Sequence, residues 1–421
     1  MRLGALKKHG YLLVLLPALA VKAGVWLHYQ PALDGRPMTY VQSAVELLER
    51  GTYRGVETFR RTPGYPLFLA AIFKFTGVNA AAVTLAQHLL GLGTAFAVMR
   101  LVFALWASPA AAAAAGLVIA LHPTLVFFES TLESETLAVF LFSCSLLLSA
   151  LALKPPVRRR WHAPAAGLAG AAAALCRPEL AAFAAVPALL LLFEPGGRKP
   201  ALAFGCAFLA PLLFWMARNS ALFGCFTLSP MGAITSLQTS GPFIDQASPA
   251  HRELKLLYAE ALKENGGDHN SVINTAVARL GANMPGGRAL AEGYRLGLET
   301  FRAHPLRYLL ATGANFRGFI GSLTYLDTAR LDPPWPLKIF QWNLLWLAAL
   351  GFAAAVRRAR GGAVVLPAAA FLCLLAANSL VEMGMPRRSI VALPALAVCA
   401  AYLVVLLEER VRALKAGNGP R

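Results

Sequence analysis

Charged residues are scarce in this chain, and their scarcity excludes most classes of soluble protein. They make up 14% of the 421 residues, whereas ordinary soluble domains carry about 25%. Hydrophobic residues make up 57%. Apolar stretches of about 20 residues, the length that crosses the hydrocarbon core of a bilayer, recur along the chain. The composition therefore predicts a membrane protein that crosses the bilayer several times.

Polar residues rarely interrupt the apolar stretches, so the candidate spans can be identified directly from the sequence. Seven stretches are long enough, at 11–28, 80–106, 110–128, 132–153, 339–356, 363–380 and 390–407. Three more are weaker, at 163–176, 180–193 and 201–217. No small-residue cleavage site follows the first stretch, which favours an uncleaved span over a signal peptide. The prediction is an all-α protein with about ten transmembrane helices.

Acidic residues are fewer than basic residues in this chain. The chain has 21 Asp and Glu against 39 Lys and Arg, with a formal net charge of +18. In a soluble chain this balance would suggest a nucleic-acid partner. Here the basic residues gather at span ends, in five clusters at 7–9, 154–162, 198–199, 357–360 and 410–415. All five lie on one side if the spans alternate, and the positive-inside rule makes that side the cytoplasm. We therefore expect no nucleic-acid partner, an inner-membrane location and two cytoplasmic termini.

Cysteine and histidine give no framework for a disulfide or a metal. Five of the six cysteines fall in apolar stretches, and only Cys225 lies in a predicted outer loop. His251, His269 and His304 are scattered without the spacing of metal ligands. No metal site is predicted, although a divalent metal is compatible with the sequence.

Two segments outside the predicted membrane core are long, at 29–79 and at 218–337. They divide the chain into an N-terminal transmembrane module (1–217), a large helical outer loop (218–337) and C-terminal helices with a tail (338–421). Within the large loop, 249–265 has the pattern of an amphipathic helix. We expect this loop to cap a membrane cavity and to help select an acceptor.

The first outer loop combines an amphipathic helix, a turn and basic residues. Apolar residues recur on one face of 40–50, which predicts a short helix lying along the membrane surface. A Pro-Gly-Tyr-Pro turn at 63–66 then opens a second short helix over 67–75. Asp34 precedes both helices, and taken alone Asp34-Gly35 also fits a simple turn.

The order of these features resembles the first outer loop of the GT-C superfamily of membrane glycosyltransferases. The similarity is to its protein-mannosyltransferase-like and aminoarabinose-transferase-like families. Further partial matches follow in order: the segment 122–137, which runs from His-Pro into an acidic motif, Cys-Arg-Pro at 176–178, Arg-Asn at 218–219, and Arg-Arg at 387–388 before Pro394. The chain departs from the pattern at two places. Arg36 stands where the family has its aspartate, two residues after Asp34, and Arg388 stands where tyrosine is usual.

The resemblance implies transfer of a hexosyl or pentosyl group from a polyprenyl-phosphate donor to a lipid, glycan or protein acceptor. A phosphate leaving group is a weak base and needs no general acid. The reaction needs one base for the acceptor hydroxyl and cations for the charge on the phosphate. The resemblance implies inversion of configuration at the sugar carbon, with Asp34 as the base. Glu57 and Glu46 are the alternative candidates for the base. Glu135 would position the acceptor or support the site.

The resemblance also implies a group of arginines for the donor phosphate, Arg61, Arg177, Arg218 and Arg387, while Tyr65 and Glu57 would belong to the acceptor side of the first loop. Structural alternatives stand beside these roles. Arg177 interrupts an apolar stretch and could instead pair with a carboxylate. Arg218 could be an interfacial anchor, and Glu133 could cap a helix together with Ser130.

Two other classes of function are compatible with a polytopic chain. A transporter or lipid flippase usually carries repeated halves and helices broken at the midplane, and no repeat is visible here. A non-catalytic scaffold would not need several cations around one carboxylate on its outer loops.

Overall fold

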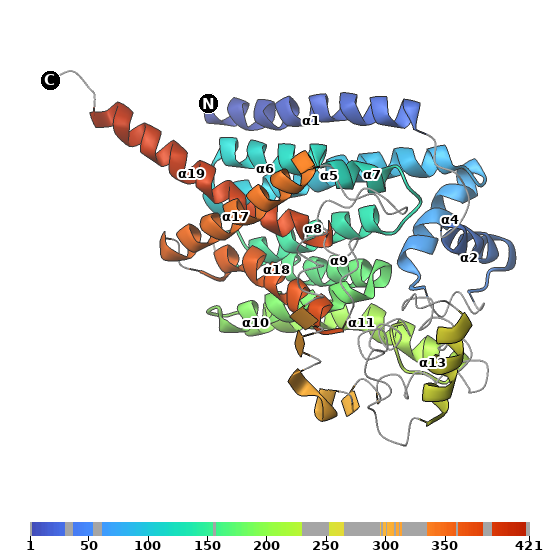
Figure 1. Ribbon diagram of the computed structural model, residues 1–421. Coiled ribbons are helices and arrows are strands. Elements are labelled where there is room, and N and C mark those ends of the chain that lie inside the picture. Colours follow the sequence, from blue (N-terminus) through green and yellow to red (C-terminus); the bar gives the residue numbers. More distant parts are fainter. Residues whose placement is uncertain are drawn as a thin grey trace.

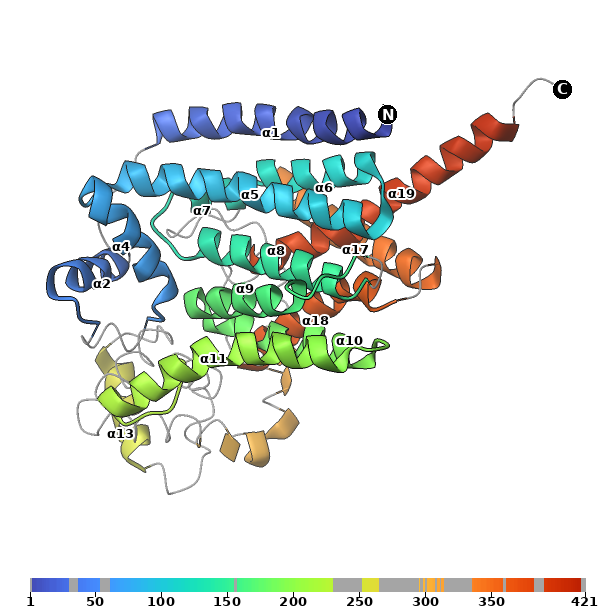
Figure 2. The same cartoon turned by 180° about the vertical axis from the view of Figure 1, so that it is seen from behind.

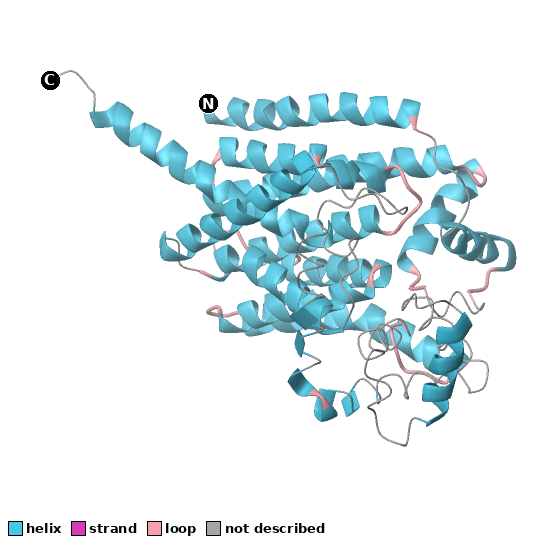
Figure 3. Cartoon of the chain, in the orientation of Figure 1, coloured by secondary structure: helices cyan, strands magenta, loops and turns pink. Residues whose placement is uncertain are grey.

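The computed structural model of the chain describes residues 2–29, 37–53, 61–154, 157–229, 252–264, 335–358, 361–381 and 390–417, with a few positions between 295 and 313. Within these ranges the chain is helical and contains no strand (Figure 3). The prediction of an all-α polytopic protein is confirmed.

The helices of the first half are α1 (Arg2–His28), α2 (Pro37–Arg50), α4 (Gly64–Thr76), α5 (Ala80–Trp106), α6 (Pro109–Leu121), α7 (Pro123–Glu129) and α8 (Glu135–Ala152). The second half holds α9 (His162–Cys176), the 3-10 helix η1 (Pro178–Ala184), α10 (Ala185–Phe193), α11 (Arg198–Phe223), α13 (Arg252–Glu264), α17 (Trp335–Arg358), α18 (Gly362–Val381) and α19 (Leu393–Gly417).

Seven of the described helices are long and apolar enough to cross a membrane, and the bent pair α6–α7 makes up to eight. They include α11, which covers the stretch at 201–217 that looked short in the sequence. It is longer because the polar residues at both ends, Arg198 and Asn219 among them, are helical too. The shorter apolar helices α9 and η1–α10 occupy the other two weak stretches.

The span expected over 110–128 consists of two helices. α6 ends at Leu121, α7 begins at Pro123, and the two helices are bent by 52°. Proline has no N–H to donate and disfavours a helical residue before it. His122 is accordingly extended. The next expected span, over 132–153, begins three residues later, at Glu135.

The long helices lie side by side in a layered bundle (Figures 1 and 2). α5 packs against α6 and α8, and α9 packs against α8 and α11. Small alanine and glycine side chains make up most of α9, which lets its neighbours approach closely. α1 packs on α5 and α6 at the edge of the bundle, and only 17% of its apolar window is buried.

The bundle has two ends, and the first outer loop marks one of them. α2, α4 and α13 lie at this first-loop end, while both chain termini lie toward the opposite end (Figure 1). The surface helix expected over 40–50 is α2, which packs on α4 through the buried Tyr40, Val41 and Ala44. The helices expected over 67–75 and 249–265 correspond to α4 and α13.

Candidate functional site

An arginine between two carboxylates lies at the first-loop end of α8 and α9. Arg177 follows the last residue of α9 in an extended conformation, because Pro178 after it disfavours a further helical turn. Its Nη1 is 2.6 Å from Oε1 of Glu135, and its Nε is 2.6 Å from Oε1 of Glu179. Arg177 is only 6% exposed and Glu135 is fully buried. The three charges therefore interact where screening by water is weak.

Glu135 is placed by the start of a helix. It is the first residue of α8, where the unpaired backbone N–H groups and the helix dipole favour a negative charge. The dipole and Arg177 together stabilise an ionised carboxylate in this buried position. The sequence alternative that Arg177 pairs with a carboxylate is thus present in the structure. Binding of a donor phosphate by Arg177 stays a prediction.

The first outer loop reaches this cluster through aromatic residues. Arg61 donates from Nη1 to the Tyr40 hydroxyl at 3.1 Å, and its Cζ lies 4.6 Å from the centre of the Tyr40 ring. The Tyr40 and Tyr65 rings meet edge to face with centroids 5.1 Å apart. The Tyr40 hydroxyl is 3.5 Å from Oγ of Ser134, the residue before Glu135. Side-chain contacts therefore connect Arg61 and Tyr65 to the start of α8.

The turn before α4 packs directly on the end of α9. Thr62 donates its hydroxyl to the carbonyl oxygen of Cys176 at 3.3 Å. A Cβ added at Gly64 would lie 2.6 Å from Cys176 Sγ and 2.7 Å from the Leu175 carbonyl oxygen. Only glycine allows this approach. It brings the Pro-Gly-Tyr-Pro turn against the residue that precedes Arg177.

Arg218 lies near the end of α11 among aromatic rings. Its Cζ is 4.4 Å from the ring centre of Trp215, 5.3 Å from that of Phe223 and 5.5 Å from that of Tyr53. Tyr53 in turn donates its hydroxyl to the Arg61 carbonyl oxygen at 3.3 Å. Burial raises the pKa of the Tyr53 phenol well above its ordinary value, so this hydroxyl remains a donor at neutral pH. Tyr53 thus contacts both Arg61 and Arg218.

The described residues bring together five of the predicted site residues and leave three outside. Arg61, Tyr65, Glu135, Arg177 and Arg218 all lie at the first-loop end. Asp34, Glu57 and Arg387 fall outside the described residues. Among the residues that the structure does describe, no group of three or more His, Cys, Asp or Glu side chains could hold a metal ion.

A second buried charged group, which the sequence reasoning missed, lies nearby. We call it the Glu129 cluster: Lys22 of α1, His88 of α5 and Glu129 of α7. Lys22 Nζ donates to Glu129 Oε2, and His88 Nδ1 is 2.9 Å from the same oxygen. All three residues are at most 3% exposed. The signal in the sequence was a lone lysine and a histidine inside otherwise apolar spans, since such residues are costly in a membrane and usually have a partner there.

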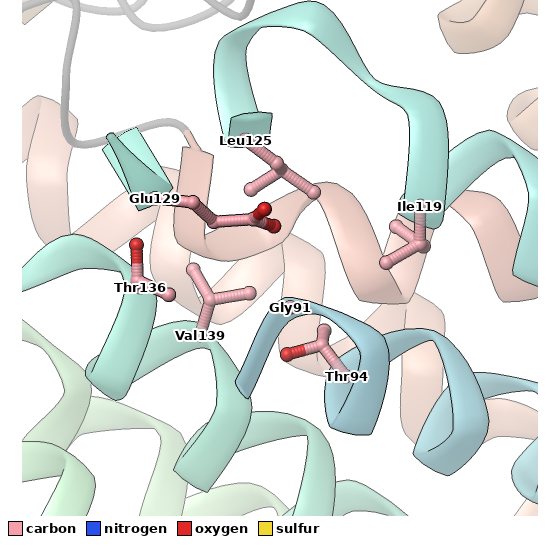
Figure 4. A pocket seen from close by; sticks show the side chains of 7 residues that line it. All are labelled: Gly91, Thr94, Ile119, Leu125, Glu129, Thr136 and Val139. Carbon is pink, nitrogen blue, oxygen red and sulfur yellow. The ribbon is translucent and has the colours of Figure 1, made fainter. Parts of the chain in front are cut away.

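A small cavity, with room for about one water molecule, adjoins this cluster. Figure 4 shows the carboxylate of Glu129 and the side chain of Thr136 at its edge, with Thr94 on the opposite side. The remaining lining is apolar and comes from Gly91, Ile119, Leu125 and Val139. The cavity lies at the junction of α5, α6, α7 and α8.

Gln87, the neighbour of His88, ties three segments together. Its Nε2 donates to the carbonyl oxygens of Thr131 at 2.6 Å and Glu129 at 3.0 Å. Its Oε1 accepts a hydrogen bond from the Tyr65 hydroxyl at 2.8 Å. One buried side chain of α5 therefore holds both α4 and the segment 130–134 between α7 and α8, which we call the α7–α8 loop.

No family model and no curated protein matches the chain, but solved structures do. ArnT from Cupriavidus metallidurans in the apo state is 16% identical, with a TM-score of 0.41, over 91% of this chain and 77% of ArnT. The same protein bound to undecaprenyl phosphate is 14% identical, with a TM-score of 0.42 and the same coverage.

The archaeal oligosaccharyltransferase AglB from Archaeoglobus fulgidus, in complex with an inhibitory peptide and a dolichol-phosphate, is also similar. The match covers 99% of this chain, with 13% identity and a TM-score of 0.54. It covers 52% of AglB, so this chain spans about half the length of that protein. At this identity the likeness concerns the fold alone. Over the residues that the structure describes, the chain is a helical protein with several helices able to cross a membrane, and its fold is similar to that of AglB.

Proposed function

We propose that the protein is a glycosyltransferase that moves a sugar from a polyprenyl-phosphate donor to a lipid, glycan or protein acceptor at the outer face of the membrane. The observation that carries the proposal is the buried Arg177–Glu135 pair beneath the first-loop helices. The GT-C-like fold supports it, because AglB, which shares the fold, was solved with a dolichol-phosphate.

The chemistry of this transfer fits the charges at the first-loop end. A phosphate leaves without protonation, so the donor side needs cations, and we propose Arg61, Arg177, Arg218 and Arg387 for it. Tyr53 contacts the backbone carbonyl of Arg61 and the guanidinium of Arg218, so these two residues lie close to each other at the first-loop end. A donor phosphate that reached Arg177 would replace one of the two carboxylates as the partner of its guanidinium.

The acceptor side needs a base, and we propose Asp34, with inversion at the sugar carbon. Glu135 would orient the acceptor, because Arg177 and the α8 dipole keep its carboxylate charged and fixed in position. Tyr65 and Glu57 would belong to the acceptor side of the first loop. Transfer of a hexosyl or pentosyl group is the finer form of this proposal.

The proposed orientation and location of the protein rest on the distribution of its basic residues. The five basic clusters fall at or beside the helix ends opposite the first-loop end, given the order and direction of the helices. We propose that this opposite end is cytoplasmic, with both termini, and that the protein resides in a bacterial inner membrane. The net charge of +18 then reflects membrane topology and needs no nucleic-acid partner.

The test is release of polyprenyl phosphate by the purified protein incubated with a panel of polyprenyl-phosphate sugars and candidate acceptors. We expect release that depends on the acceptor. A transporter or flippase would instead move the intact donor between the leaflets of a reconstituted vesicle. Movement without any release, across the whole panel, would contradict the proposed function.

A further inference from the structure

The Glu129 cluster is separate from the Arg177 ion pairs, and its three residues have no assigned role in the reaction proposed above. Lys22 is the one charged residue of the window 11–28 in α1, and it is 1% exposed. A lysine in a span is costly unless it is paired. Most of the window 11–28 is exposed, and Lys22 is the charged member of the buried stripe that it forms with Val14 and Ala18.

Lys22 acts on the α7–α8 loop through Glu129. Glu129 is the last residue of α7, and the five residues after it lead directly to Glu135 at the start of α8. Its carboxylate is held by Lys22 and His88, and its backbone carbonyl is held by Gln87. His88 Nε2 is also 3.5 Å from the hydroxyl of Ser130. The beginning of the loop is therefore fixed by both its side chains and its main chain.

The backbone of α5 leaves space for this arrangement at one position. The Glu129 carboxylate lies against Gly91, and a Cβ added there would overlap it. The small cavity lies beside the same carboxylate (Figure 4). It also touches Thr136, the residue after Glu135, whose buried hydroxyl has no hydrogen-bond partner among the residues that the structure describes. The cluster thus adjoins both the beginning of the loop and the helix turn that follows it.

We propose that the Glu129 cluster is a positioning centre for Glu135. Lys22 and His88 fix Glu129, Glu129 and Gln87 fix the loop over 130–134, and the loop sets Glu135 against Arg177. This inference rests on the proposed function only where it concerns turnover. The effect on the loop itself can be measured without any substrate.

Two variants disturb the cluster in different ways. Lys22→Met combined with Glu129→Gln removes both charges, which avoids leaving one buried charge without its partner. Gly91→Ala keeps every charge but displaces the carboxylate. Gly24→Ala is the matched control, because nothing lies within 4 Å of a Cβ added at Gly24, two residues from Lys22 on the same helix. Lys22→Arg retains the cation and should preserve part of the function.

The first readout is hydrogen–deuterium exchange of the backbone over 130–134 in the purified full-length protein. We expect faster exchange in the double variant and in Gly91→Ala, with Gly24→Ala unchanged. If the cluster only attaches α1 to the bundle, exchange will rise along α1 and stay at the wild-type level in the loop. That result would overturn the proposal.

The second readout is the reaction. A misplacement of about 1 Å can cost on the order of 10²-fold in rate, so we expect kcat to fall by that order while the KM for the donor stays near that of the wild type. The kcat of Lys22→Arg should lie between that of the double variant and that of the wild type. Loss of thermal stability with kcat unchanged would contradict positioning. Absence of turnover in the wild type would reject the proposed function alone, because the exchange measurement still decides the role of the cluster.

Discussion

Arg177 is held between two carboxylates in a part of the protein from which water is nearly excluded. Glu135 and Glu179 each lie 2.6 Å from one of its nitrogens. Removing one partner of a buried ion pair typically costs about 3–5 kcal/mol, because the other charge stays buried without compensation. Arg177→Ala alone therefore changes folding and donor binding together, and a variant that separates the two effects is needed.

A triple substitution provides that separation. Arg177→Met with Glu135→Gln and Glu179→Gln removes the cation and both carboxylates, so no buried charge is left unpaired. We expect it to fold, yet to bind a polyprenyl phosphate about 10- to 100-fold more weakly, since a charge-assisted contact contributes about 1.5–3 kcal/mol. Arg177→Lys, which keeps a cation between the two carboxylates, is the control. Wild-type affinity in the triple variant would leave Arg177 a purely structural role.

The proposed base is tested by a change that preserves shape. Asp34→Asn cannot accept a proton, and general-base catalysis typically contributes about 10²–10⁴-fold. We expect turnover to fall by that order while donor affinity stays near that of the wild type. Glu57→Gln, on the same loop, is the control. If Glu57→Gln loses turnover and Asp34→Asn retains it, then Asp34 is only a turn residue.

At the scale of elements, the Tyr65 phenol links α4 to α5. The fully buried Tyr65 donates to Gln87, and the same glutamine holds the α7–α8 loop. Tyr40 packs edge to face against the Tyr65 ring and contacts Ser134. The two surface helices α2 and α4 and the start of α8 are therefore mechanically connected.

Tyr65→Phe should weaken this connection. The ring contact with Tyr40 remains, but the Gln87 oxygen loses its donor in a buried site, at a cost of about 1–3 kcal/mol. We expect that loss in the free energy of unfolding measured in detergent, together with lower turnover. Tyr53→Phe is the comparison, because its 3.3 Å hydrogen bond to Arg61 is longer and Tyr53 is only half-buried. An equal or larger loss in Tyr53→Phe would contradict the assigned role of Tyr65.

The helices were predictable from the sequence where the local pattern of apolar residues determines them. The apolar run at 80–106 became α5 with the same bounds, and the amphipathic pattern at 40–50 became most of α2. The break at His122 was missed although Pro123 was visible, because a test of length and hydropathy does not consider the backbone. The first turn of α4 was missed because Gly64 begins the helix by packing on Cys176, a contact that local pattern does not contain.

At the scale of the molecule, the order of the motifs along the sequence predicted five residues that the structure brings together at the first-loop end. They are Arg61, Tyr65, Glu135, Arg177 and Arg218. The partners of these residues could not be found in the same way. Lys22 and Glu129 are 107 positions apart, and Gln87 acts on carbonyl groups more than 40 positions away. Such contacts depend on which helices are neighbours, and a single apolar span can pack against many others. Glu179 was near enough to notice, but a carboxylate beside a proline turn also fits an exposed loop.

The sidedness of the whole molecule is the last prediction, because every proposed reaction step requires it. The first-loop end carries α2, α4 and α13, and the basic clusters fall at the other end. Moving such clusters across the membrane is disfavoured, so we expect a reporter fused after Lys263 of α13 to lie outside and one fused after Arg160 to lie in the cytoplasm. Fusions at both positions control for each other, since they must report opposite sides. A cytoplasmic Lys263 would place Glu135 and Arg177 on the side away from any extracytoplasmic acceptor, and the proposed transfer could not occur there.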